Sequence, residues 1–92
     1  MLDPELIEGL EEAVEESPDN RALHLHLVAL LMANGLHDRA LGHCQWIMLH
    51  EPDSMEALAL AAGCAEGLGD DDRARRYRRV FDALQAADSA GV

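Results

Sequence analysis

The chain has 92 residues and a formal net charge of −11, which predicts one small domain and disfavours contact with nucleic-acid phosphates. Leucine and alanine each occur 15 times, whereas lysine and threonine are absent and only three residues are aromatic. Because strong helix formers dominate, we expect an all-α fold in a single domain spanning residues 1–92.

The N-terminal segment and the cysteines indicate the compartment. Residues 1–16 contain no basic residue, and no apolar run approaches the roughly 20 residues that span a bilayer. Cys44 and Cys64 lie in apolar helical contexts without a CxxC motif, which predicts free thiols in the core of a reduced protein. We expect a cytoplasmic protein with no membrane partner and no nucleic-acid partner.

The first half of the chain predicts two helices. The first covers residues 5–16, where apolar residues recur at helical spacing, and it ends at Ser17 and Pro18. Asp19 and Asn20 are expected to cap the second helix, which runs to about residue 33 and is stopped by Gly35.

The second half predicts three more helices. One covers residues 37–50, with its buried stripe centred on Cys44, and the next opens at Pro52-Asp53-Ser54 and runs to residue 68. Asp53 and Glu56 have the spacing of a capping box at the start of that helix. The last helix is expected from residues 70–72 to about residue 87, followed by a frayed tail.

A period of 34 residues runs through these elements. Turn-forming and small residues in a fixed phase are the punctuation of a repeated helical hairpin. The recurring landmarks are Pro18-Asp19 with Pro52-Asp53, Gly35 with Gly69, and Asp38-Arg39-Ala40 with Asp72-Arg73-Ala74.

This pattern resembles the tetratricopeptide repeat (TPR), a 34-residue helix-turn-helix unit. The resemblance implies a five-helix antiparallel stack with a capping helix in residues 1–18, repeats at 21–54 and 55–88, and a tail at 89–92. The chain departs from the family pattern at His24 and Arg78, which stand where the family usually has aromatic residues. The matching positions are Leu27, Gly35, Ala40, Pro52, Gly69 and Ala74.

The start of the chain has a weaker resemblance to the short repeat region that precedes the ATPase module of some actinobacterial AAA-type proteins. It rests on Asp3-Pro4, on Ser17-Pro18-Asp19, and on the preference for arginine over lysine. No phosphate-binding Gly-x-x-x-x-Gly-Lys motif is present, so this chain is not expected to hydrolyse nucleotide by that route.

Catalytic and metal sites are not expected. The five histidines lack the spacing of a zinc site, and the acidic run in residues 11–16 has the pattern of a solvated helix face. His24 is expected to be a packed neutral ring, whereas His37, His43 and His50 are expected to be solvated. We therefore predict no cofactor and no enzyme activity.

The TPR resemblance implies that a protein or peptide partner binds a concave groove. None of the groove residues is basic, so a partner segment should be apolar or basic. The residues expected there are Leu25, Ala29, Met32, Glu56, Ala59 and Glu66.

A second candidate surface is centred on Trp46. At about 100° per residue, Trp46 lies roughly 160° from the buried stripe of its helix, so it points outward beside His43, Leu49 and His50. Exposed tryptophan with apolar neighbours is typical of an interface hot spot. The alternative is that Trp46 covers the edge of a neighbouring helix within the monomer.

The charges are also divided along the chain. Residues 1–20 carry eight acids and no base, whereas residues 73–79 hold five of the seven arginines. These arginines either form i,i+4 pairs with acids on their own helix or meet the acidic helix of a second copy.

The sequence thus predicts a non-catalytic protein-interaction module. The alternative is a self-association or scaffold domain, such as the N-terminal adaptor of a larger ATPase.

Overall fold

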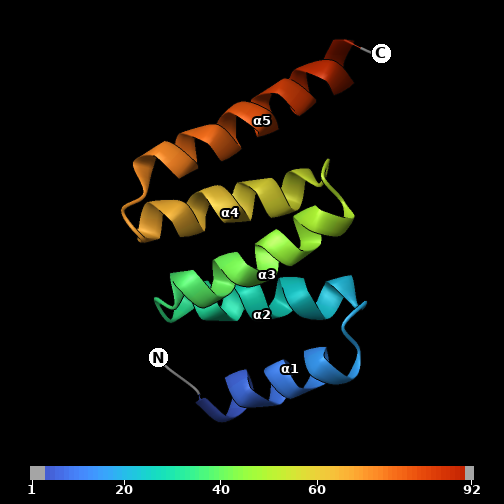
Figure 1. The fold of residues 1–92 in the computed structure, drawn as a ribbon, viewed down its shortest axis with the longest axis vertical. Helices are drawn as coiled ribbons and strands as arrows, with labels where there is room; N and C mark the ends of the chain where they lie inside the picture. Colours follow the sequence, from blue (N-terminus) through green and yellow to red (C-terminus); the bar gives the residue numbers. More distant parts are fainter. Residues whose placement is uncertain (1–3, 91–92) are drawn as a thin grey trace.

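A computed structural model describes residues 4–90, and the side chains of residues 4–88. This part of the chain contains helices and no strand, so the predicted all-α fold is confirmed (Figure 1). The helices are α1 (Pro4–Glu16), α2 (Arg21–Ala33), α3 (His37–His50), α4 (Met55–Gly67) and α5 (Asp71–Ala90).

The helices form a single stack. Each helix packs antiparallel against the next one along the chain, with α1 and α5 at opposite ends (Figure 1). The helices α2 and α4 run in the same direction and also touch, although α3 lies between them in sequence. The described residues extend over 44 × 29 × 18 Å, and the longest dimension follows the stack.

Two turns in the stack share one glycine-dependent geometry. Gly35 has a φ of 75° and Gly69 a φ of 77°, in the left-handed region that favours glycine. After α2, the Leu36 amide donates to the Leu31 carbonyl, and the Asp70 amide donates to the Ala65 carbonyl after α4. Each is the long hydrogen bond of a Schellman motif, so both helices end in the same way, 34 residues apart.

The two proline-containing turns are also alike. Asn20 caps α2 by accepting a hydrogen bond from the Leu23 amide at 3.2 Å, and Ser54 caps α4 by accepting from the Ala57 amide at 3.2 Å. The capping box expected from Asp53 and Glu56 is therefore wrong. Ser54 caps instead because α4 begins at Met55, one residue later than that motif requires.

The core runs through the stack along the inward stripes of the helices. Its largest fully buried side chains come from the middle three helices, and α1 and α5 each cover one end of it. The predicted stripe around Cys44 is confirmed, and Cys44 and Cys64 are buried free thiols, as expected. The fully buried side chains of greatest volume are Leu27, Val28, Leu31, Cys44, Ile47 and Cys64.

Two glycines let α4 approach its neighbours closely. A Cβ at Gly63 would lie 3.1 Å from Met32 Cε of α2, and one at Gly67 would lie 2.5 Å from His37 Cδ2 of α3. His37 is consequently half-buried rather than solvated, because its ring fills the space that a side chain at position 67 would need.

The last helix differs from its expected form in two ways. It continues to Ala90, so the predicted fraying from residue 88 is wrong for residues 88–90, and residues 91–92 lie outside the described part. Its arginines also form different ion pairs from the expected i,i+4 pairs. The ion pairs found are Arg73 with Asp70, Arg75 with Asp72 and Arg78 with Glu66 of α4.

Candidate functional site

The residues expected to form a groove lie on two adjacent helices. Leu25, Ala29 and Met32 follow one stripe of α2, beside the buried stripe, and Glu56, Ala59 and Glu66 follow one stripe of α4. We call these six residues the α2–α4 face. Met32 lies over Gly63 at one end, which joins the two stripes.

The α2–α4 face is apolar and only partly covered. Leu25 and Met32 are half-buried, whereas Ala29 and Ala59 are exposed. Small exposed side chains allow another backbone to approach, and the flanking leucine and methionine supply apolar contact area.

The two carboxylates of the α2–α4 face already have partners within the chain. Glu56 Oε2 lies 3.7 Å from Arg21 Nη2, and Glu66 forms an ion pair with Arg78 of α5. Their charges are partly compensated, so the face offers less attraction to a basic segment than the sequence suggested.

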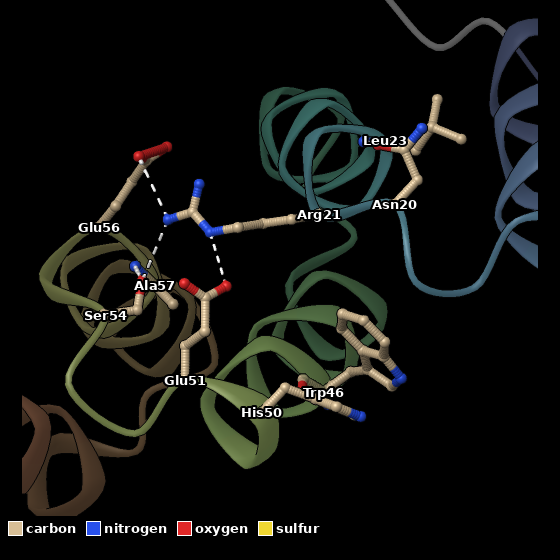
Figure 2. A network of polar contacts seen from close by, with 9 residues as sticks. All are labelled: Asn20, Arg21, Leu23, Trp46, His50, Glu51, Ser54, Glu56 and Ala57. Carbon is tan, nitrogen blue, oxygen red and sulfur yellow. Dashed lines mark hydrogen bonds and ion pairs between the residues drawn. The ribbon is translucent and has the colours of Figure 1, made fainter.

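Arg21 ties together the ends of this face (Figure 2). Its Nε lies 2.8 Å from Glu51 Oε2, and its Nη2 donates to Ser54 Oγ at 3.3 Å. Figure 2 shows the guanidinium reaching from the start of α2 to Glu51, Ser54 and Glu56 around the α3–α4 turn. The arginine therefore fixes the first turn of α2 against the first turn of α4.

A shallow depression continues the α2–α4 face toward α5. Its volume is about 300 Å³, and Ala59 belongs to both surfaces. We call it the α4–α5 depression. Its walls are apolar apart from Arg78 and Asp82, and its lining residues are Leu58, Ala59, Ala62, Arg78, Phe81 and Asp82. This volume suits one or two side chains of a partner rather than a drug-sized ligand.

Trp46 does not stand free on the outside of α3. Its ring stacks on His24 of α2 with centroids 3.9 Å apart and planes inclined by 13°, and on His50 with centroids 4.2 Å apart. We call His24, Trp46 and His50 the aromatic stack. Trp46 is half-buried, so it covers the edge of α2, which was the second of the two expectations for this residue.

His24 holds the stack against the α1–α2 turn. The expectation that it packs as a buried ring is confirmed, since it is 3% exposed. Its Nε2 donates to the Pro18 carbonyl at 2.8 Å, because a carbonyl oxygen can only accept. Its Nδ1 lies 3.1 Å from Nδ1 of His43, which is half-buried rather than solvated.

The Nδ1 atoms of the two facing histidines lie at hydrogen-bond distance, so one ring must donate and the other accept. When His24 is neutral, its Nδ1 carries a lone pair, so His43 Nδ1 must donate. Burial, followed by the charge of His24, lowers the pKa of His43, and Arg39 acts in the same direction whereas Glu11 opposes it. This pair therefore favours neutral His43.

The other members of the predicted Trp46 surface face solvent. Leu49 is 79% exposed, and His50 is exposed while its Nδ1 lies 2.9 Å from the Trp46 carbonyl. The structure thus brings His43, Trp46 and His50 together around α3. Leu49 is left as a single exposed apolar side chain, which is ordinary on a protein surface.

The metal-ligating side chains of the described residues are dispersed, and the Cys44 thiol is buried. The described residues contain no group of three or more side chains suited to hold a metal ion. Burial, and then the proximity of Cys64, raises the pKa of the Cys44 thiol to about 12, so it is a poor nucleophile at neutral pH. No helix in residues 4–90 is long and apolar enough to cross a membrane.

Two contacts of the candidate site were missed from the sequence. Arg21 has no counterpart at the equivalent position 34 residues later, which is Met55, and its partners lie in a turn about 30 residues away. The His24–His43 contact joins two helices, and the spacing of histidines along one helix could not reveal it.

Comparison of the chain with protein-family models, curated proteins and solved structures gives no match. The structure itself offers several candidate functional surfaces. They are the α2–α4 face with the α4–α5 depression, the aromatic stack, and the outer sides of the two end helices.

Proposed function

We propose that the chain is a non-catalytic protein-interaction module of TPR type that binds a segment of a partner protein on the α2–α4 face. The observation that carries the proposal is the continuity of this face with the α4–α5 depression through Ala59. The 34-residue period and its resemblance to the tetratricopeptide repeat support the same function.

The partner segment is expected to be apolar at its anchor. A side chain of leucine or phenylalanine size fits the α4–α5 depression of about 300 Å³, whose walls include Leu58 and Phe81. Because Glu56 and Glu66 are already paired with arginines, basic residues flanking the anchor add little.

Rigidity supports this role. Arg21 links the first turn of α2 to the α3–α4 turn and to the first turn of α4, and Met32 packs over Gly63 near the other ends of α2 and α4. A surface with contacts at both ends is preorganised, so binding a partner costs less conformational entropy.

The test uses selection from a displayed library of random short peptides on the full chain. Ala59→Arg places a long charged side chain at the junction of the face and the depression. Gln45→Arg places the same side chain on an exposed position of α3 and is the matched control. Selected peptides should share an apolar anchor, bind wild type and Gln45→Arg equally, and bind Ala59→Arg at least tenfold more weakly. Failure to enrich any peptide, or equal binding to Ala59→Arg, would overturn the proposal.

A further inference from the structure

The outer side of α1 is a stripe of carboxylates at one end of the stack. The helix buries Ile7 and Val14 against the rest of the chain. At about 100° per residue, Glu5, Glu12 and Glu16 project on the opposite side, and all three are exposed.

The outer side of α5, at the other end of the stack, is mainly basic, although the exposed Asp72 also lies on it. This helix turns Ala74, Tyr77 and Phe81 toward α4, so the residues opposite them face away from the stack. Among these outward residues are Arg75 and Arg79, with Arg76 beside them. All three are exposed, and they are followed by the small side chains of Ala83 and Ala86.

These arginines are incompletely paired within the chain. Arg73 and Arg78 lie on the flanks of α5 and pair with Asp70 and Glu66. Arg75 pairs with Asp72, a contact in which both side chains are at least 70% exposed. Among the described residues, Arg76 and Arg79 make no ion pair.

Like charges also stand one turn apart on both outer sides. Glu12 and Glu16 on α1, and Arg75 and Arg79 on α5, are i,i+4 pairs, which disfavour the isolated helix. A surface of opposite sign laid against either helix replaces this repulsion by attraction. The chain itself supplies both surfaces, at opposite ends of its long axis (Figure 1).

We propose that the outer side of α5 binds the outer side of α1 of a second copy, so that copies stack head to tail. Charge complementarity identifies α1 of a second copy as the partner of the α5 face. Three arginines of α5 face three glutamates of α1, and the neighbouring alanines of α5 allow close approach. The two faces differ, so the contact is heterologous and each added copy presents a fresh α1 or α5. The product is an open chain of copies rather than a closed dimer.

The net charge of −11 sets the salt dependence of this association. Stacked copies have centres separated by about the 44 Å length of the molecule, whereas the facing side chains are in contact. At 0.1 M salt the Debye length is about 10 Å, so the long-range repulsion is screened more than the facing pairs. Association is therefore expected to be strongest at intermediate ionic strength, and weaker at about 0.01 M and at about 1 M.

Sedimentation velocity across a protein concentration series tests the proposal. Wild type should show a mass that rises with concentration near 0.1 M salt. The variants Arg75→Glu/Arg76→Glu/Arg79→Glu and Glu5→Arg/Glu12→Arg/Glu16→Arg should each lose this rise, because each then carries one sign of charge at both ends. Mixing the two variants should restore it, since opposite ends again face each other.

Mixing the two triple variants distinguishes a specific contact between the end faces from a non-specific attraction between whole molecules. Both variants remain net negative, because three charge reversals cannot offset a net charge of −11. The double variant His26→Glu/Gln45→Glu, at exposed positions of α2 and α3, should associate like wild type although it is also more negative. Circular dichroism confirms that each variant is folded, and if one variant is unfolded, the other still tests its own face.

A monomeric wild type at all salt concentrations would overturn the proposal, as would association that persists in both variants or fails to return on mixing. The outcome is independent of the proposed function. Ala59→Arg should leave head-to-tail association unchanged. The triple variant Arg75→Glu/Arg76→Glu/Arg79→Glu should still bind a selected peptide.

Discussion

The indole of Trp46 links two helices by lying between two imidazoles. Its stack on His24 joins α3 to α2, and His24 in turn reaches the Pro18 carbonyl. Trp46→Ala should therefore lower the free energy of unfolding by about 2 kcal/mol, which is less than the cost of truncating a fully buried aromatic ring because the ring of Trp46 is only half-buried. Urea denaturation measures this loss.

Leu49 is the matched comparison for Trp46, because it lies on the same helix and is 79% exposed. Leu49→Ala should change the free energy of unfolding by less than about 0.5 kcal/mol. Similar losses in the two variants would show that the stack contributes nothing and that Trp46 is available to a partner.

The His24–His43 contact makes stability depend on pH. The pKa of His43 is lowered from 6.5, first by burial and then by the charge of His24. The unfolded chain therefore takes up this proton more readily than the folded chain. The contribution of His43 is fully present above pH 6.5, and it declines as the pH falls from 6.5 toward the folded pKa.

Urea denaturation at about pH 7.5 and about pH 5.5 measures stability on both sides of the ordinary histidine pKa, so it tests whether the contribution of His43 declines at the lower pH. Wild type should lose stability at the lower pH, and His43→Gln should lose less because it has no proton to take up. His26→Gln, at an exposed position of α2, should behave like wild type. If His43→Gln and wild type changed in stability by the same amount between the two pH values, the prediction would be wrong.

At the scale of the helices, the close approach of α4 to α3 depends on Gly67. A Cβ at Gly67 would lie 2.5 Å from the His37 ring, whereas a Cβ at Gly42 of α3 meets nothing within 4 Å. Gly67→Ala should destabilise the chain by about 1 to 3 kcal/mol through overpacking. Gly42→Ala should stabilise it by about 0.5 to 1 kcal/mol, because alanine has the higher helix propensity.

Thermal unfolding of the two glycine variants gives the sign of each effect. The double variant Gly67→Ala/His37→Ala removes the ring that the new methyl group strikes, so it should be more stable than Gly67→Ala alone. A neutral Gly67→Ala would show that the His37 ring moves aside without cost.

The helices could be predicted because their signals are local. Turn residues and apolar stripes lie within one or two turns of each boundary, so residues 37–50 were assigned correctly from the sequence. The site was predicted less well because its contacts cross between helices. The stacking of Trp46 on His24 and the pairing of Glu66 with Arg78 depend on helix rotation and separation, which a pattern of residue types does not encode.

At the scale of the whole molecule, each helix depends mainly on its neighbours. The first helix, α1, packs mainly against α2 and is joined to α3 by the Arg39–Glu11 ion pair, and the last residues of α5 extend past the shorter α4 (Figure 1). In such a stack, local opening starts at the ends and the middle opens last. Backbone amides of α3 and α4 should therefore exchange most slowly with solvent, and those of α1 and of residues 82–88 fastest.

Native-state hydrogen exchange of Ile7→Ala tests this order. Ile7 is 3% exposed and attaches α1 to the core, so its truncation should speed exchange throughout α1 and leave α4 nearly unchanged. Leu27→Ala, at a fully buried position of α2, should speed exchange in all five helices, because α2 contacts α1, α3 and α4. If Ile7→Ala sped exchange equally in α1 and α4, the described residues would unfold as one unit, and end-first opening would be wrong.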